Sequence, residues 1–266
     1  MAVIDAIAKG IGVPLWRLFG GVSNTITTDI MIPIVSPAEA ANLALKYFKE
    51  GFSTLKLKVG NNLDSDIEVL KAIRKVHPDC SFILDANEGY TADEVIEVIE
   101  KLHEMGVTPI LFEQPIHKDD WEGLRRVTHV VKSKYRIFVA ADESCRSLVD
   151  VEKIIKENLV DVINIKLAKV GALGALKIIE VVRKFGLNLM IGGMVATSWL
   201  WALLVIWLLA LGVSNSMIWI HPFFCRRIHF LGVMKVYSSK CFSEGFYRYV
   251  CVIKASIFSA CYYRLL

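Results

Sequence analysis

The sequence predicts an α/β fold in which strands alternate with helices, and most simply a (β/α) barrel of the TIM type. Short apolar runs alternate with amphipathic segments through the first 195 residues. Ionisable residues close to the ends of these runs follow one another at intervals of 27, 28, 29 and 24, about the length of one strand plus one covering helix. Such near-equal repeats favour a barrel over a doubly wound sheet. A doubly wound sheet is also disfavoured because no glycine-rich phosphate loop follows an early strand.

The first predicted elements are a helix over 1–18, a strand over 29–35 and a helix over 38–48. Ser36 suits the N-cap of the second helix and Pro37 suits its first position. The barrel is therefore expected to begin with the strand over 29–35.

The segment 54–60, TLKLKVG, has the two-residue period of a strand. Its leucines share one face, and Lys56 and Lys58 share the other, with ammonium groups about 7 Å apart at strand rise. Two like charges at this distance disfavour each other, so a strand that carries them inward needs acidic partners.

The strand–helix repeats after residue 60 supply these acidic partners at the ends of their strands. Thr91 and Glu94 form the pattern of a capping box, and residues 171–174 are expected to form a loop. The predicted helices cover 64–76, 95–105, 121–132, 149–157 and 175–185, and the predicted strands cover 82–85, 110–113, 137–141, 162–166 and 189–192. We therefore expect an incomplete barrel of about seven strand–helix repeats.

Three acidic residues, Asp85, Glu113 and Asp142, end neighbouring strands of this barrel. Carboxyl ends of barrel strands converge on one mouth, so the three carboxylates are expected to meet there. Oxygen ligands of this kind suit Mg²⁺. Lys58 and Lys166 are expected to flank the metal from opposite sides of the mouth.

This arrangement indicates a definite chemistry. A metal cation and a second lysine, Lys56, depress the pKa of a lysine and make it a usable general base. A carboxylate substrate on the metal has a more acidic α-proton, so the predicted reaction is proton abstraction next to a carboxylate. Asn87 is expected to help by hydrogen bonding, and Lys169 is expected at the rim rather than as a base.

The alternative interpretation is that each charged residue is only a turn residue or a solvated group. This interpretation holds for most single charged residues at strand ends. The regular series favours function over this interpretation. His77, His103, His117 and His129 are expected at the surface. The six cysteines show no metal spacing, which favours a reduced, intracellular protein, cytoplasmic or soluble within an organelle.

Five motifs in order, TLKLKVG, ILDANEGY, LFEQP, AADES and INIKLAKVGA, resemble the muconate-lactonizing subgroup of the enolase superfamily. Within the subgroup they are most similar to dipeptide epimerases of the L-Ala-D/L-Glu type. The opening MAVIDAIAKGIGVPLWRLFGG resembles the segment that precedes the barrel in this family. The resemblance covers residues 1–195.

The resemblance implies a Mg²⁺-dependent racemase or epimerase that acts on dipeptides. Alternatives are a muconate-type cycloisomerase and a non-catalytic, truncated remnant associated with a membrane. The implied partner is a small carboxylate substrate, and the question of a homo-oligomer stays open. The implied roles are Mg²⁺ ligands for Asp85, Glu113 and Asp142, acid/base lysines for Lys58 and Lys166, and support of Lys58 and of the substrate carboxylate for Lys56.

Three departures from the family pattern accompany the resemblance. No capping domain is expected before Met1, and Ala196 stands where the family continues with a glutamate and an amphipathic helix. Dipeptide epimerases carry an Asp-x-Asp in the eighth strand, but no aspartate follows Asp161. We therefore expect a truncated barrel domain over 1–195.

Residues 196–266 differ sharply in composition, since they hold one of the 27 acidic residues and carry the excess positive charge. This charge lies on no recognisable nucleic-acid motif, so a nucleic-acid partner is not expected. The hypothesis is that this tail derives from an altered reading frame or retained non-coding sequence. The uncharged run 196–213 approaches the length of a membrane-spanning helix, and a buried barrel helix is the rival interpretation. Two unpaired strand edges and poor stability are expected.

Overall fold

The computed structural model describes residues 3, 6–7, 10–13, 25–60, 62–193, 217–219, 235–243 and 246–254. Much of the predicted helix over 1–18, and all of the run 196–213, lie outside these residues. Among the described helices, none has both the length and the apolar character needed to cross a membrane. The domain boundary at residue 195 and the origin of the tail stay predictions.

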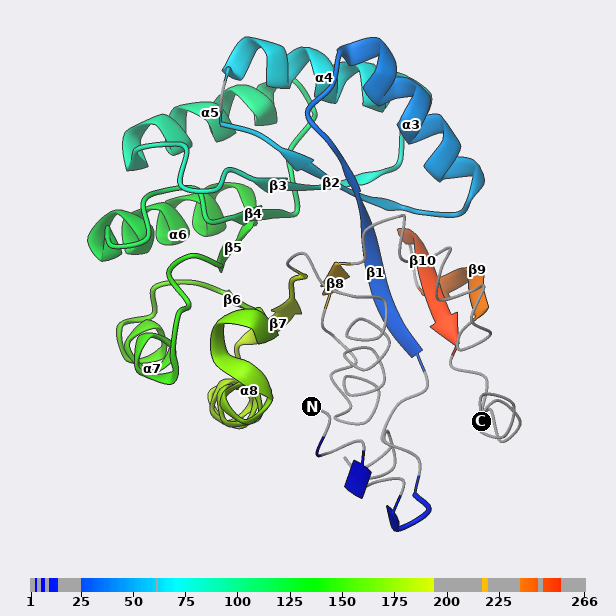
Figure 1. Cartoon of the computed structure of the whole chain (residues 1–266). Coiled ribbons are helices and arrows are strands. Elements are labelled where there is room, and N and C mark those ends of the chain that lie inside the picture. The colour runs from blue at the N-terminus through cyan, green and yellow to red at the C-terminus, as the bar shows by residue number, and fades with distance from the viewer. Residues whose placement is uncertain are drawn as a thin grey trace.

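Strands and helices alternate along the described chain, with the helices on the outside of a strongly curved sheet (Figure 1). The predicted α/β barrel fold is confirmed, and most element ends fall within a few residues of the prediction. The elements are β1 Thr25–Ile32, α3 Pro37–Lys49, β2 Thr54–Lys58, α4 Leu63–Val76, β3 Ser81–Asp85, α5 Ala92–Glu104, β4 Leu111–Glu113, α6 Trp121–Tyr135, β5 Phe138–Ala141, α7 Leu148–Glu157, β6 Val162–Ile165, α8 Leu167–Lys184, β7 Asn188–Ile191, β8 Met217–Trp219, β9 Lys235–Ser243 and β10 Phe246–Lys254.

Strands β1 to β7 pair in parallel with their neighbours in chain order. The short strand β8 then pairs in parallel with β7, through Met190 and Met217, and with β1, through Thr28 and Ile218. The expectation of two unpaired edges on β1 and β7 is therefore wrong, because β8 bridges them. The hairpin of β9 and β10 adds to β1 in the antiparallel sense.

The helix before β7 differs from its prediction. The helix α8 starts directly after β6, with Lys166 at its N-cap, and not after a loop at residues 171–174. Gly171 interrupts it with φ 67° and ψ 174°, a left-handed region that glycine enters without a steric penalty. The predicted loop is thus a kink, and the first turn of α8 lies next to the end of β6.

Apolar side chains fill both sides of the sheet. The larger core lies between the strands and the helices. A smaller inner cluster takes one residue from each of five successive strands, namely Ile83, Leu111, Ala140, Val162 and Met190. Because side chains alternate along a strand, the residues two positions later point to the same inner side. These residues are Asp85, Glu113, Asp142, Asn164 and Gly192.

One histidine does not lie where its context predicts. His77 is buried, and its Nε2 lies 2.9 Å from the carbonyl oxygen of Phe52. Its ring also packs against Phe48. The surface prediction is wrong for His77, because a contact distant in sequence covers it, whereas His103, His117 and His129 are exposed as predicted.

Candidate active site

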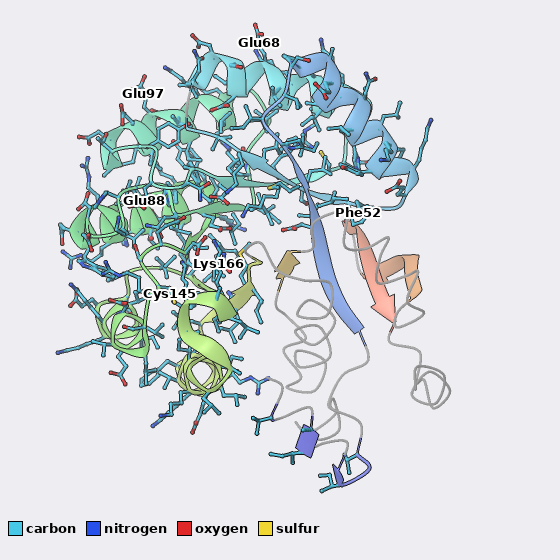
Figure 2. The ribbon with its side chains drawn as sticks, viewed as in Figure 1. Phe52, Glu68, Glu88, Glu97, Cys145 and Lys166 are labelled. Atoms are coloured by element: carbon cyan, nitrogen blue, oxygen red, sulfur yellow. The ribbon has the colours of Figure 1, made fainter. Side chains whose placement is uncertain are left out.

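The predicted residues meet inside the barrel, at the carboxyl ends of β2 to β6. Figure 2 shows Lys166 on the inner side of the curved sheet, whereas Glu68 and Glu97 point outward from the helices. The structure brings together all six predicted residues, namely Lys56, Lys58, Asp85, Glu113, Asp142 and Lys166. We call this set, together with Lys169, the mouth cluster.

Lys56 forms the floor of the mouth cluster. Its Nζ lies 2.6 Å from Oδ2 of Asp85 and 2.8 Å from Oε2 of Glu113, and its side chain is fully buried. Strand register explains this contact, because Asp85 and Glu113 are direct partners on β3 and β4. Lys58, two residues after Lys56, is more exposed and donates to the same oxygen of Asp85 at 2.7 Å.

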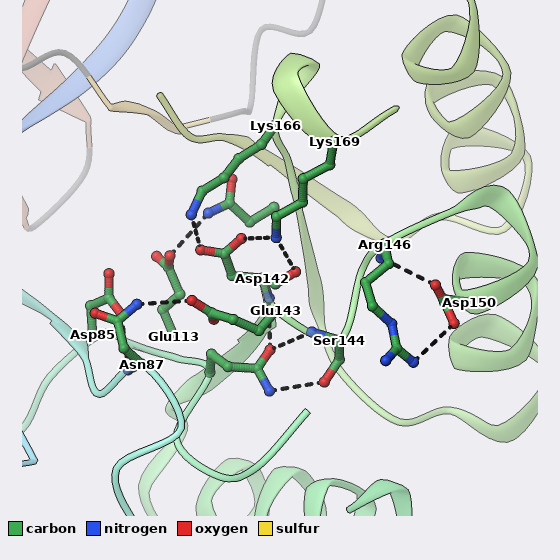
Figure 3. A network of polar contacts seen from close by, with 12 residues as sticks. Asp85, Asn87, Glu113, Asp142, Glu143, Ser144, Arg146, Asp150, Lys166 and Lys169 are labelled. Carbon is green, nitrogen blue, oxygen red and sulfur yellow. Dashed lines mark hydrogen bonds and ion pairs between the residues drawn. The ribbon is translucent and has the colours of Figure 1, made fainter. Parts of the chain in front are cut away.

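On the other side of the cluster, two lysines bind Asp142 (Figure 3). Lys166 donates to Oδ2 of Asp142. Lys169 donates to Oδ1 at 2.7 Å and to the backbone carbonyl oxygen of the same residue at 2.8 Å. The early start of α8 explains the second lysine, since residues three apart on a helix lie on one face. Lys169 is therefore part of the cluster rather than a rim residue.

Asn87 links the two sides of the mouth. Its Oδ1 accepts a hydrogen bond from Lys58, and its Nδ2 donates to Oε1 of Glu143 at 3.0 Å. Figure 3 shows this side chain between Asp85 and Glu143. The predicted help by hydrogen bonding is thus present, and it reaches Lys58 directly.

Two further residues were missed by sequence reasoning. Asp29 is buried on β1, and its carboxylate interacts with the charges of Lys56 and Asp85. Asn164 is buried on β6 and donates to Oε1 of Glu113 at 3.0 Å. The signal for Asn164 was its position two residues before Lys166, on the same face of the strand.

Gly192, on the segment after β7, leaves the space that the side chains of Asn164 and Lys166 occupy. A Cβ atom there would lie 2.8 Å from Oδ1 of Asn164 and 2.9 Å from Cε of Lys166. These separations are too short for a side chain, so glycine at this position lets Asn164 and Lys166 occupy their places.

Burial and neighbouring charges shift the ionisation of the cluster. Burial raises the pKa of Glu113 to about 8, against the opposing charge of Lys56. Burial also lowers the pKa of Lys56. Burial works against ionisation of Asp142 too, but the ammonium groups of Lys166 and Lys169 hold the pKa of this carboxyl below its usual range.

The pKa of Lys166 shifts in the opposite direction from that of Lys56. Burial disfavours its charged form, but the carboxylate of Asp142 outweighs burial and raises the pKa of Lys166. The sequence prediction of a lysine with a depressed pKa assumed a bound cation and a second lysine. In the structure, the lowered pKa belongs to Lys56, because Lys56 is the more deeply buried of the two.

The residues present fit a divalent cation by their chemistry. Asp85, Glu113 and Asp142 are buried carboxylates, which provide the oxygen ligands that Mg²⁺ prefers. In addition, Oε2 of Glu143 is buried and has no hydrogen-bond partner among the residues that the structure describes. Within the described residues, no three acidic, histidine or cysteine side chains are close enough together to hold a metal ion. Lysine ammonium groups form ion pairs with all three carboxylates.

The fold and this cluster define an α/β barrel with an acidic, lysine-flanked centre at the carboxyl ends of its strands. Residues 39–236 match the family described as Enolase C-terminal domain-like. The chain belongs to this family, as its motifs predicted.

Relatives of known name that match this chain are epimerases. An L-Ala-D/L-amino acid epimerase from Populus trichocarpa is 73% identical over 197 residues, which cover 74% of this chain and 47% of the relative. An L-Ala-D/L-Glu epimerase from Thermotoga maritima is 40% identical over 193 residues, covering 73% of this chain and 55% of the relative. The chain thus spans about half the length of the curated relatives it matches. The named relatives are epimerases, which are isomerases.

Solved structures of epimerases also resemble this chain. The chain resembles a substrate-liganded L-Ala-D/L-Glu epimerase from Bacillus subtilis with a TM-score of 0.79 and 30% identity, over 96% of this chain and 68% of the other. It also resembles a dipeptide epimerase from Enterococcus faecalis complexed with Mg and the dipeptide L-Leu-L-Tyr, with a TM-score of 0.76 and 30% identity, over 95% of this chain and 68% of the other.

Proposed function

We propose that the chain is a Mg²⁺-dependent epimerase that removes and returns the proton at the carbon next to a carboxylate, with a dipeptide as substrate. The observation that carries this proposal is the position of Lys58 and Lys166 at the two ends of a row of three buried carboxylates. Inversion at a carbon needs one proton-transfer group on each face, and two lysines across a shared centre meet this need.

Each residue of the mouth cluster has a proposed role. Asp85, Glu113 and Asp142 would hold the Mg²⁺, which stabilises negative charge on the substrate carboxylate when bound. Nζ of one flanking lysine takes the α-proton, and Nζ of the other returns a proton to the opposite face. Lys56 supports Lys58 and the substrate carboxylate with its positive charge from the floor of the cluster.

The substrate class rests on the relatives. Those named above act on L-Ala-D/L-amino acid and L-Ala-D/L-Glu substrates, and a structural neighbour binds L-Leu-L-Tyr. This favours an epimerase over a muconate-type cycloisomerase. We therefore propose a dipeptide, with an L-Ala-D/L-Glu type as the first to test.

The test follows the α-proton separately from each epimer. The chain is incubated in deuterated water with Mg²⁺ and either L-Ala-L-Glu or L-Ala-D-Glu, and deuterium incorporation is measured by mass spectrometry. We expect both epimers to exchange with the unmodified chain. Lys58→Ala and Lys166→Ala should each lower epimerisation by about 10²- to 10⁴-fold, the usual contribution of a positioned acid or base. Each variant should retain exchange from one epimer only, and opposite epimers should survive in the two variants.

Lys101→Ala serves as the matched control, because Lys101 is an exposed lysine paired with Glu97 on α5. It should exchange both epimers at the original rate. Exchange of both epimers that persists undiminished in Lys166→Ala would count against the proposed mechanism.

A second candidate is a non-catalytic barrel, and the lysine contacts on Asp85, Glu113 and Asp142 favour it. The two candidates differ in their response to metal. Thermal melting with Mg²⁺ at millimolar concentration should raise the Tm if the site is functional, because a ligand that binds only the folded state stabilises it. An unchanged Tm favours the non-catalytic chain.

A further inference from the structure

Gln114 occupies a strained position directly after Glu113. Its side chain is fully buried, and its φ of 36° lies in the left-handed region that side-chain-bearing residues rarely adopt. Its backbone N–H donates to the carbonyl oxygen of Ala140 at 2.9 Å, and its carbonyl oxygen accepts from the N–H of Glu88 at 2.9 Å. The backbone of this one residue therefore joins the end of β4 to β5 and to the loop after β3.

The side-chain amide of Gln114 uses its whole hydrogen-bonding capacity. Oε1 accepts from the backbone N–H of Asp142 at 2.9 Å and of Ser144 at 3.0 Å. Nε2 donates to the carbonyl oxygen of Ile116 at 3.0 Å and to Oγ of Ser144 at 2.8 Å. An amide has two donors and an oxygen with two lone pairs, so all four positions are occupied.

These bonds converge on the three loops at the carboxyl ends of β3, β4 and β5, next to the three carboxylates. The loop after β3 follows Asp85, the loop after β4 follows Glu113, and the loop after β5 contains Asp142. Ser144 extends the network, because its Oγ donates to the carbonyl oxygen of Lys118 at 2.9 Å. Gln114 thus fixes the backbone around all three acids, while none of its hydrogen bonds to the described residues reaches a carboxylate oxygen.

We propose that Gln114 is a positioning residue that sets the spacing of Asp85, Glu113 and Asp142 and thereby the affinity of the site for Mg²⁺. This inference rests on the proposed function. The physical reason is that a metal needs its ligands within a narrow range of geometry, and the residues that orient the ligands govern affinity almost as strongly as the ligands do.

A purely structural role is the competing interpretation, since any buried amide that loses its partners destabilises a fold. The two roles separate in a metal titration of folded protein. Gln114→Met keeps a long side chain and removes all four amide bonds. Ser144→Ala removes only the hydroxyl that links Gln114 to Lys118. Thr128→Val is the control, because Oγ1 of Thr128 makes a buried bond of 2.8 Å to the carbonyl oxygen of Leu159 at the other end of the barrel.

Each variant is confirmed as folded by circular dichroism and then titrated with Mg²⁺ by calorimetry, without substrate. We expect Gln114→Met to raise the Kd for Mg²⁺ by about 10- to 100-fold, the usual effect of losing an orienting partner. Ser144→Ala should raise it to a smaller extent, and Thr128→Val should lower the Tm without changing the Kd.

The outcomes separate this inference from the proposed function. If the unmodified chain binds no Mg²⁺, the proposed function fails and the inference fails with it. If the unmodified chain binds Mg²⁺ and Gln114→Met binds it equally well, the inference alone is overturned. If Gln114→Met does not fold, Ser144→Ala decides, and an unchanged Kd in that variant overturns the inference.

Discussion

At the amino-terminal end of the barrel, buried polar side chains each have a fixed partner. Asp161 accepts from Lys132 and from the backbone N–H of Val139, and Thr128 donates to a carbonyl oxygen. At the carboxyl-terminal end, Lys56 lies between two carboxylates, and Asp142 lies between two lysines. At the amino-terminal end, a few hydrogen bonds satisfy each of these polar groups. At the carboxyl-terminal end, charged groups lie together and shift one another's pKa. The comparison teaches that one fold can use buried charge for stability at one end and concentrate it for chemistry at the other.

The largest effect is expected from removing the floor of the mouth cluster. Lys56→Met leaves Glu113 buried without its ammonium partner and leaves Asp85 with Lys58 alone, so the free energy of unfolding should fall by about 3–5 kcal/mol. Urea unfolding measures this loss, with Lys101→Met as the control at an exposed lysine. The loss should shrink in saturating Mg²⁺. An equal loss with and without Mg²⁺ would argue that the acids do not share a metal.

An intermediate effect is expected at the opposite end. Asp161→Ala leaves the N–H of Val139 buried without its side-chain acceptor, which should lower the free energy of unfolding by about 1–3 kcal/mol. The increase in Tm produced by Mg²⁺ should be unchanged. If Asp161→Ala altered the response to Mg²⁺, the contrast between the two ends would be wrong.

The smallest effect concerns pH and His77. Burial lowers the pKa of His77 below its usual 6.5, so the unfolded chain binds the proton more readily than the folded chain. Its contribution to stability is therefore present above pH 6.5 and is lost as pH falls from 6.5 through the lower folded pKa. His77→Gln should flatten the pH dependence of the Tm in this range, and the exposed His103→Gln should leave it unchanged. A slope that persists in His77→Gln would contradict this assignment.

Periodicity was enough to predict the strands and the ionisable groups at their ends. Lys56, Asp85 and Glu113 followed from the two-residue alternation and the repeat length, because both are local properties of the chain. The same local rules gave no information about Asp29, whose role depends on β1 lying beside β2. Likewise, the contact between His77 and Phe52 joins two loops that no periodicity relates.

Two further differences have a geometric origin. Lys169 was predicted at the rim, whereas α8 begins one residue after Lys166 and its first turn brings Lys169 to Asp142. Gln114 was passed over because an amide between Glu113 and a proline looks like an ordinary turn residue. Its importance comes from bonds to residues 142 and 144 on the next strand's loop, which only the folded chain reveals.

The bridge made by β8 has a consequence for the order of folding. The mouth cluster extends from Lys56 to Lys169, in consecutive repeats, and the contact between Lys56 and Glu113 spans 57 residues. The seam between β1 and β8 instead pairs Thr28 with Ile218, across most of the chain. Contacts so distant close slowly because chain entropy opposes them, and domains begin to form from the amino-terminal side during synthesis. The arc that bears the chemistry is therefore expected to assemble early on the ribosome, with the seam joining afterwards.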